Sequence, residues 1–331
     1  MSKKVFSYHL PKELIATRPP EKRENARLMV VDREKNEIKH LKFRDVIDFL
    51  NEGEVLVLNN TKVIPARLFG RKSTGGAVEL LLLEKKEPGL WLVLIRGRVR
   101  EGTQMVFEKI SAVVLKRNED GSWIVRFDAE QDDLFKIGKM PIPPYLKRLP
   151  DEKDNFDYQT VYAEKIGSIA APTAGLHFTT ELLNQLKEKG ITIVFLTLHI
   201  GWASFKLIGD KRQNVPSEFF EIPDETARII NNAMETRRKI CAVGTGTVRA
   251  IESAFEKEKV VAKKGYTNLF IEPGYRFHCI DKMITNFHLP GSTHLYMVCA
   301  FGGTNLIQKA YNEAVNHRYN FYSYGDAMLI I

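Results

Sequence analysis

The stretch that decides the fold is residues 241–254, which read CAVGTGTVRAIESA. A short apolar run ends in a glycine–threonine turn, and a run whose apolar residues have helical spacing follows at once. A strand that passes through a tight glycine turn into a helix is typical of α/β proteins. The free N–H groups of such a turn attract anions and polar ligand atoms, so the sequence predicts a ligand at this turn.

The glycines of this turn match part of the G-x-G-x-x-G fingerprint of dinucleotide-binding folds. Gly244 and Gly246 fill the first two positions, but Arg249 stands at the third, where a glycine lets helix and strand pack closely. The segment also comes late in the chain, not in a first strand–helix–strand unit. A nucleotide-cofactor oxidoreductase is therefore disfavoured. The plain alternative is a turn without a ligand, in which Glu252 pairs with Arg249 one helical turn away.

Strand and helix patterns alternate on both sides of a β-rich middle region. Residues 27–60 predict a hairpin, a helix and a buried strand, and residues 157–331 predict alternating helices and strands, including a helix over 247–259. Residues 67–140 hold short strand patterns separated by turn signals, and the proline-rich segment 139–150 closes them. We therefore predict an α/β domain of residues 1–66 and 151–331, with a mixed sheet or barrel covered by helices, and an inserted all-β small barrel domain of residues 67–150.

The composition limits the class of protein. Of the 331 residues, 44% are hydrophobic and 27% are charged, which is typical of a folded protein, and no apolar run is long enough to span a membrane. The formal net charge of +8 permits RNA binding without establishing it. The three cysteines lie far apart and the eight histidines are scattered, so we expect no metal. Because the N-terminus also lacks a signal-peptide pattern, these features predict a cytoplasmic protein.

Two loops offer histidines for acid–base chemistry. His177 lies in residues 170–179, AAPTAGLHFT, where small residues crowd the backbone just before a helix. Asn286 and His288 lie in residues 285–293, TNFHLPGST, at the end of a strand. A loop histidine titrates near neutral pH and can move a proton. The structural alternatives are a histidine that orders its loop and, in the second segment, capping and turn formation.

Basic residues gather in and beside the β-rich region. Residues 59–67, NNTKVIPAR, form a polar loop after a strand, for which a domain hinge is the alternative reading. Arg96, Arg98 and Arg100 alternate in a strand pattern and would share one face. Together with Arg67, Arg71 and Lys72, they predict a surface that follows a phosphate backbone.

Nine segments, in order, carry a resemblance that covers nearly the whole chain. They read YHLPKELIA, NNTKVIPARLFGRK, MPIPPY, YQTVYAE, AAPTAGLHFT, TLHIG, VGTGTVRAIES, TNFHLPGST and FYSYGDAM. The chain resembles the S-adenosylmethionine:tRNA ribosyltransferase-isomerases, the family that forms epoxyqueuosine on tRNA. Two places depart from the family's pattern: Trp202, Ala203, Ser204 and Phe205 stand where the family has a Gly-Thr-Phe run, and Pro216 replaces a histidine.

The resemblance implies an enzyme that transfers and isomerises the ribosyl moiety of S-adenosylmethionine. The acceptor is the aminomethyl group of 7-aminomethyl-7-deazaguanine at the tRNA wobble position, and adenine and methionine leave. S-adenosylmethionine is then a substrate, so neither a cofactor, a metal nor a membrane partner is expected. A non-catalytic tRNA-binding protein is the alternative, which would bind tRNA without consuming S-adenosylmethionine.

This chemistry assigns residues to three groups. A sulfonium acidifies the neighbouring CH₂, and adenine leaves more easily when its ring is protonated, so acid–base side chains are needed while the nucleophile belongs to the RNA. We expect His177 and Glu218 as acid–base residues, with His288 and Asp326 behind them. The residues expected to bind S-adenosylmethionine are Thr173, Gly175, Gly244, Thr245, Gly246, Thr247, Arg249, Glu252 and Asn286. Those expected to bind tRNA are Asn59, Asn60, Lys62, Arg67, Arg71, Lys72, Arg96 and Arg98.

Overall fold

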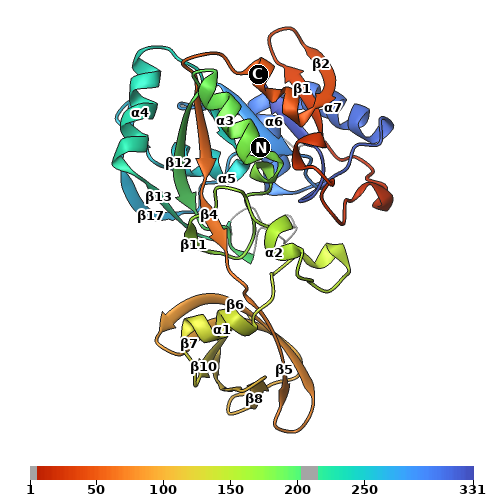
Figure 1. Ribbon diagram of the computed structural model, residues 1–331, viewed down its shortest axis with the longest axis vertical. Helices are drawn as coiled ribbons and strands as arrows, with labels where there is room; N and C mark the ends of the chain where they lie inside the picture. The colour runs from red at the N-terminus through yellow and green to blue at the C-terminus, as the bar shows by residue number, and fades with distance from the viewer. Residues whose placement is uncertain (1–5, 203–214) are drawn as a thin grey trace. The chain divides into compact units, whose positions relative to one another are not determined.

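A computed structural model describes residues 6–202 and 215–331, and its chain divides into two compact units (Figure 1). The α/β unit comprises the described residues of Met1–Lys62, Gln159–Lys165 and Ala171–Ile331. The barrel unit comprises Val63–Tyr158 and Ile166–Ala170. The sequence predicted the inserted domain at residues 67–150. The barrel unit begins four residues earlier, extends to Tyr158 and also includes Ile166–Ala170.

The segments at these ends belong to the barrel unit because they pack on it. At the first end, the carbonyl of Ala66 accepts the N–H of Leu82 at 2.8 Å, and Ile64 belongs to the apolar core of the barrel. Farther along, Arg148 forms an ion pair with the buried carboxylate of Asp154. Turn signals in the sequence mark where strands end, but they do not show that the following connector packs on the same unit.

A nine-stranded mixed sheet forms the centre of the α/β unit, in the order β17-β13-β12-β3-β14-β18-β19-β1-β2. The four adjacent strands β12, β3, β14 and β18 run parallel, whereas β13 is antiparallel to β12, and β19 is antiparallel to β18. The strands are β1 (Arg27–Asp32), β2 (Glu37–Lys42), β3 (Val55–Asn59), β12 (Thr192–Leu198), β13 (Glu218–Ile222), β14 (Ile240–Val243), β17 (Lys263–Thr267), β18 (Lys282–Asn286) and β19 (Ala327–Ile330).

Helices cover both faces of this sheet, which explains why β3 and β14 are apolar without alternation. One face packs against α4 (Asp224–Glu235), α5 (Thr245–Ser253), α6 (Thr293–Gly302) and α7 (Thr304–Asn316). The other face packs against α3 (Thr180–Glu188) and the 3-10 helix η3 (Phe43–Phe49), and α3 lies in front of the sheet in Figure 1. The predicted α/β domain is thus a helix-covered open sheet. The remaining short elements of this unit are η1 (Lys12–Leu14), η2 (Arg23–Asn25) and η5 (Thr173–His177).

The barrel unit is a closed antiparallel barrel, as predicted, in the order β10-β7-β6-β5-β8-β9. Its interior is filled by alternating apolar side chains such as Leu80, Val93 and Phe107, all of which are buried. The strands are β5 (Arg67–Lys72), β6 (Ala77–Glu87), β7 (Leu90–Arg96), β8 (Gln104–Phe107), β9 (Ile110–Arg117) and β10 (Trp123–Phe127). The unit also holds α1 (Gln131–Ile137), η4 (Pro144–Leu146) and α2 (Asp154–Asp157), while β4 (Thr61–Val63) and β11 (Lys165–Ser168) lie where the chain passes between the units.

Two local predictions from the sequence are wrong. The helix expected over 247–259 spans Thr245–Ser253 and is followed by a hairpin of β15 (Phe255–Glu256) and β16 (Lys259–Val260). Lys257 and Glu258 form its turn with positive φ angles of 49° and 65°, which a helix cannot contain. In the barrel, β7 ends at Arg96, so Arg98 and Arg100 lie in the following loop and not on the same strand face.

Membrane-spanning helices are absent from the described parts of the chain, where no helix is long and apolar enough to cross a bilayer.

Candidate active site

The loops that carry the predicted site residues meet at one edge of the large sheet. Because β12, β3, β14 and β18 are parallel, their carboxyl ends lie at the same edge. A Cβ atom built on Gly244, after β14, would lie 3.7 Å from Cβ of Ala174 in η5. The amide nitrogen of Asn286, at the end of β18, lies 3.4 Å from Nε2 of His177. Segments around His177, Gly244 and His288 are therefore neighbours.

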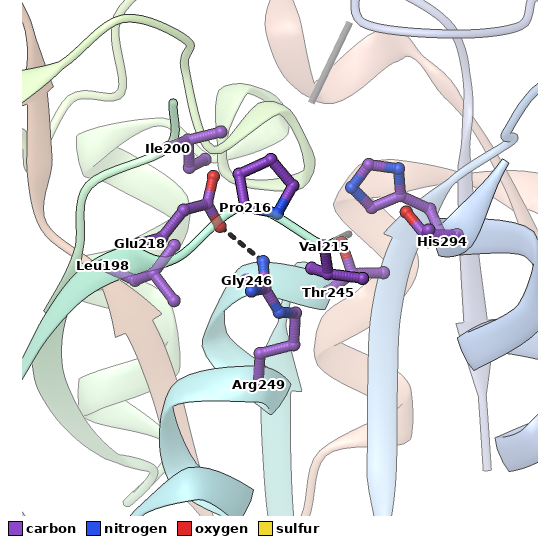
Figure 2. A pocket seen from close by; sticks show the side chains of 10 residues that line it. Leu198, Ile200, Val215, Pro216, Glu218, Thr245, Gly246, Arg249 and His294 are labelled. Atoms are coloured by element: carbon purple, nitrogen blue, oxygen red, sulfur yellow. Dashed lines mark hydrogen bonds and ion pairs between the residues drawn. The ribbon is translucent and has the colours of Figure 1, made fainter. Parts of the chain in front are cut away.

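A pocket of about 60 Å³ opens at this edge (Figure 2). Its volume holds a small polar group, because sites that enclose a whole drug-sized ligand measure roughly 300–1,000 Å³. Figure 2 shows Arg249 and Glu218 meeting on one side of the pocket and His294 on the other. Pro216, which departs from the family's pattern, also lines it. The lining residues are Leu198, Ile200, Val215, Pro216, Glu218, Thr245, Gly246, Arg249, Thr293 and His294.

An ion pair between Arg249 and Glu218 forms one wall of the pocket. The guanidinium also donates to the carbonyls of Leu269 and Thr267, at 3.1 and 3.2 Å. The second carboxylate oxygen of Glu218 accepts the N–H of Gly201 at 2.8 Å. Both oxygens of Glu218 are thus engaged, and its observed role is to hold Arg249 and the end of β12.

The glycine–threonine turn divides into residues that line the pocket and residues that hold the turn. Thr245 and Gly246 line the pocket, and as the first residues of α5 their N–H groups have no acceptor within the helix. Gly244 takes a φ of 90°, which favours glycine, and its N–H donates to the carbonyl of Ile284 at 2.8 Å. Thr247 is buried and its hydroxyl donates to the carbonyl of Val243 at 2.5 Å.

Glu252 was expected either to bind S-adenosylmethionine or to pair with Arg249, and in the structure it pairs with the loop before β18 and not with Arg249. Its carboxylate accepts the backbone N–H groups of His278 and Cys279, each at 3.1 Å, and the hydroxyl of Tyr275 at 3.1 Å. Helical spacing puts Glu252 near Arg249 along α5, but a buried carboxylate is stabilised better by several N–H donors than by one shared cation. Glu252 therefore orders the loop before β18.

His177 is buried in η5 and packs on the ring of Phe43, with the ring centroids 4.9 Å apart. Burial, with a smaller contribution from the charge of Arg23, lowers the pKa of His177 to about 4, so the imidazole is neutral at pH 7. The amide of Asn286 donates to the carbonyl of Tyr322 at 3.0 Å, which fixes its orientation beside His177.

Gly175 and Thr173 lie in the same 3-10 helix. A Cβ atom on Gly175 would come within 2.0 Å of the hydroxyl of Tyr162, so the glycine is required by packing. Thr173 is partly exposed. Neither residue lines the pocket of Figure 2.

Two histidines stack beside the pocket, and only one of them was predicted as a site residue. The rings of His288 and His294 lie 5.1 Å apart at an angle of 23°. His288 shares a hydrogen bond of 2.7 Å between Nε2 and the hydroxyl of Thr285, and burial places its pKa well below the usual value. His294 lines the pocket, and burial together with the charge of Arg249 lowers its pKa to about 4. His294 immediately follows the TNFHLPGST segment, so a search that extended past the capping Ser292 would have found it.

Asp326 is the fourth predicted acid–base residue. Its carboxylate accepts the backbone N–H groups of Arg27 and Asn320, both at 2.7 Å, and the side chain of Arg27 at 3.3 Å. These bonds tie the turn before β19 to the start of β1. Asp326 thus has a structural role, and its role in proton transfer stays a prediction.

Comparison with known proteins identifies the family. A family model described as queuosine biosynthesis protein matches residues 3–330. The chain belongs to this family. The resemblance predicted from the nine sequence segments is therefore confirmed.

Relatives in this family share one name. The S-adenosylmethionine:tRNA ribosyltransferase-isomerase of Thermotoga maritima is 46% identical over 334 residues, which covers 98% of each chain. The protein of that name from Clostridioides difficile is 46% identical over 342 residues and covers 100% of both chains. A crystal structure of S-adenosylmethionine tRNA ribosyltransferase from Thermotoga maritima is 40% identical, covers 98% of this chain and 99% of that one, and matches with a TM-score of 0.59.

The asparagines expected to bind RNA form hydrogen bonds that hold the α/β unit together. Asn59 donates to the carbonyl of Leu198 at 2.9 Å and accepts its N–H at 3.0 Å. Asn60 donates to the carboxylate of Glu164 at 3.1 Å and accepts the hydroxyl of Thr197 at 2.7 Å. Both asparagines are buried, whereas Lys62 is exposed and open to an RNA contact.

The cations predicted to form a basic surface on the barrel unit fall into two groups, those that contact other groups of the chain and those that line a groove. Arg67 and Arg96 both approach Glu79, at 3.5 and 3.7 Å, so one carboxylate faces two of the expected RNA-binding cations. Arg71 donates to the carbonyl of Gly75 within its own turn. A groove of about 540 Å³ lies near these residues, and it is lined by Lys72, Ser73, Thr74, Arg98, Val99, Arg100, Glu101, Gly102, Thr103 and Gln104.

Clusters of metal-ligating side chains do not occur within residues 6–202 and 215–331. The three cysteines are free and buried. The departures at Ala203, Ser204 and Phe205 lie outside the described residues, while Trp202 lies just inside them.

Proposed function

We propose that this chain is an S-adenosylmethionine:tRNA ribosyltransferase-isomerase. It transfers and isomerises the ribosyl moiety of S-adenosylmethionine onto the aminomethyl group of 7-aminomethyl-7-deazaguanine at the tRNA wobble position. The products are epoxyqueuosine-tRNA, adenine and methionine. The observation that carries this proposal is near-full-length identity of 46% to enzymes of that name, combined with the gathering of the shared loops at one sheet edge.

S-adenosylmethionine binds, in this proposal, at the carboxyl edge of the parallel strands. The free N–H groups of Thr245 and Gly246 at the start of α5 suit the methionine carboxylate, since a helix N-terminus attracts negative charge. The guanidinium of Arg249 lies on a wall of the same pocket, where it is paired with the carboxylate of Glu218. A pocket of about 60 Å³ accommodates such a group, and the nucleoside then extends from it along the edge.

The reaction asks little of the protein besides positioning and proton transfer. The sulfonium acidifies the CH₂ beside it, and the nucleophilic amine belongs to the RNA. The adenine ring becomes a better leaving group when it is protonated. S-adenosylmethionine is consumed as a substrate, so the proposal requires neither a cofactor nor a metal, and it places the reaction in the cytoplasm with the tRNA.

Phosphates of the tRNA bind the groove of the barrel unit. Lys72, Arg98 and Arg100 line that groove beside the hydroxyl groups of Ser73, Thr74 and Thr103. Cations on an exposed groove gain affinity by displacing counterions from the phosphates. Arg100, which the sequence placed on the surface that follows a phosphate backbone, takes the place of Arg67 in this assignment because Arg67 is turned toward the connector and Glu79.

One assay tests the function. The protein is mixed with S-adenosylmethionine and tRNA that carries 7-aminomethyl-7-deazaguanine, and free adenine and methionine are measured. Both should form in equal amounts, and neither should form with tRNA that carries unmodified guanine. If the protein bound the modified tRNA without releasing adenine, the result would contradict the proposal and favour a non-catalytic tRNA-binding protein.

A further inference from the structure

His294 is the histidine of the pocket, and its imidazole has no hydrogen-bond partner among the residues that the structure describes. It lies in the first turn of α6 and lines the pocket opposite the pair of Arg249 and Glu218 (Figure 2). The ring is partly exposed to this pocket. Both ring nitrogens are therefore available to a bound molecule.

The four residues expected to act as acid or base are all engaged. Glu218 accepts from Arg249 and Gly201, and Asp326 accepts from Arg27 and Asn320. The imidazole of His288 is bonded to Thr285, and Nε2 of His177 faces the amide of Asn286. Proton transfer at the bonded atom of any of them would break a hydrogen bond that the fold has already formed.

The position of the His294 ring is fixed without occupying its nitrogens. Its ring stacks on that of His288. His288 is itself anchored through Thr285 and through its backbone, whose N–H donates to the hydroxyl of Tyr311 at 2.9 Å. Ser292 caps α6 by accepting the N–H of Leu295 at 3.3 Å. A group held this way needs no reorganisation when a substrate arrives.

The surroundings of His294 keep its imidazole neutral. Burial and the positive charge of Arg249 lower the pKa of His294 to about 4. Its place in the first turn of a helix disfavours the imidazolium for the same electrostatic reason. At pH 7 the ring is therefore in the form that accepts a proton.

We infer that His294 is the acid–base residue of the proposed reaction, and this inference rests on the proposed function. Its imidazole takes a proton from the ribosyl CH₂ bonded to the sulfonium. The C–H bond breaks, its electron pair stays on the carbon beside the positive sulfur, and a new N–H bond makes the imidazolium. That pair then forms a double bond to C4′ as the C4′–O4′ bond of the ribose ring breaks, and the freed pair on O4′ forms a carbonyl at C1′. The glycosidic bond breaks with its electron pair on adenine, and a ring nitrogen of adenine takes the proton back from the imidazolium. The imidazole ends neutral, ready for the next turnover.

The test compares the wild-type protein with His294→Gln, using S-adenosylmethionine with hydrogen or deuterium on the ribosyl CH₂ beside sulfur. Loss of a general base lowers kcat by roughly 10²–10⁴-fold. We expect that loss in His294→Gln, with KM for S-adenosylmethionine changed only a few-fold. The deuterium isotope effect should rise, because proton removal becomes the slow step. His9→Gln, at an exposed histidine, is the matched control and should keep wild-type rates.

A structural role for His294 would give a different result. In that case His294→Gln would raise KM or lower the melting temperature, and the isotope effect would not change; that outcome overturns the inference. His294→Ala gives a second reading, because added imidazole should restore part of its adenine release. A folded His294→Ala protein that imidazole does not rescue also counts against it. Failure of the wild-type protein to release adenine would refute the proposed function itself, so the two failures remain distinct.

Discussion

The carboxyl edge of the large sheet and the groove of the barrel unit are both rich in polar side chains, yet they use them differently. At the sheet edge, residues such as Asn59, Glu218 and Asp326 are buried and bonded to one another's backbones and side chains. In the barrel groove, Arg98 and Arg100 reach solvent. Buried polar groups are normally paired. His294 is only partly buried, faces the pocket and has no hydrogen-bond partner among the described residues, which suits a substrate contact. Exposed cations indicate a partner that carries many negative charges and is recognised by charge more than by the shape of its surface.

The largest effect is expected where a buried charge loses its partner. Replacing Arg249 by Ala leaves the carboxylate of Glu218 buried beside Gly201, and breaking such a pair costs about 3–5 kcal/mol. Urea denaturation should show this loss in the α/β unit. The double variant Glu218→Gln with Arg249→Met should recover part of it. A loss below about 1 kcal/mol would mean that the pair is solvated and that the sheet edge resembles the barrel groove.

Acid should destabilise the α/β unit before the barrel unit. All eight histidines lie in the α/β unit, and His177 and His294 have pKa values of about 4 in the folded protein. Because an unfolded histidine has a pKa near 6.5, the unfolded state binds the extra protons first. The stability from keeping them neutral is complete above about pH 6.5 and is lost as the pH falls toward 4. For buried His177 this loss amounts to about 3 kcal/mol.

Hydrogen exchange at several pH values checks this order, because it follows the two units separately. Amides of β3 and β14 should lose protection between pH 6.5 and 4, while those of β6 and β7 should keep it. His177→Phe should flatten the response of the α/β unit. Equal loss of protection in both units would contradict the histidine account.

A smaller effect is expected at the close contact inside the α/β unit. Replacing Gly175 by Ala would push a methyl group against the hydroxyl of Tyr162, and such overpacking costs about 1–3 kcal/mol. Thermal unfolding measures the loss. Adding Tyr162→Phe should recover part of it by removing the oxygen. If Gly175→Ala is neutral, η5 is less tightly packed than the structure indicates.

The smallest effect of a single substitution is expected in the barrel groove, on the affinity for tRNA. Each of Lys72→Ala, Arg98→Ala and Arg100→Ala should weaken tRNA binding and lower the slope of log affinity against log salt by about 1. Lys136→Ala is the matched control, because that lysine pairs with Asp133 on α1 and does not line the groove. Titrations of tRNA at several salt concentrations provide the measurement. An unchanged salt slope in all three variants would remove the groove from the RNA surface.

Periodicity and turn signals predicted most of the fold, because they act over short distances. The hairpin of β1 and β2, the capped helix α3 and the closed barrel all follow from local patterns. The helix after the glycine turn was predicted too long, since its end depends on positive φ angles at Lys257 and Glu258. Local sequence signals do not show that a residue such as Lys257 adopts a positive φ angle.

The sequence predicted which loops form the candidate site, but not which of their side chains pair with one another. The GTGT turn and the loops of His177 and His288 do meet, because parallel strands end at one edge. Whether Glu218 is free or tied to Arg249 depends on residues far apart in the sequence. The same holds for Asn59, whose amide pairs with a strand more than a hundred residues away. Residue type thus indicated the chemistry of the site. Only the fold showed which side chains form hydrogen bonds within the protein and that the imidazole of His294 forms none with the described residues.

The central claim is that the carboxyl edge of the large sheet binds S-adenosylmethionine with its reacting carbon beside His294. A crystal structure of the protein with S-adenosylmethionine tests this most directly. We expect the methionine carboxylate at the N–H groups of Thr245 and Gly246, and the CH₂ beside sulfur within about 3–3.5 Å of an imidazole nitrogen of His294. S-adenosylmethionine bound elsewhere, or with that carbon turned away from His294, would contradict the account.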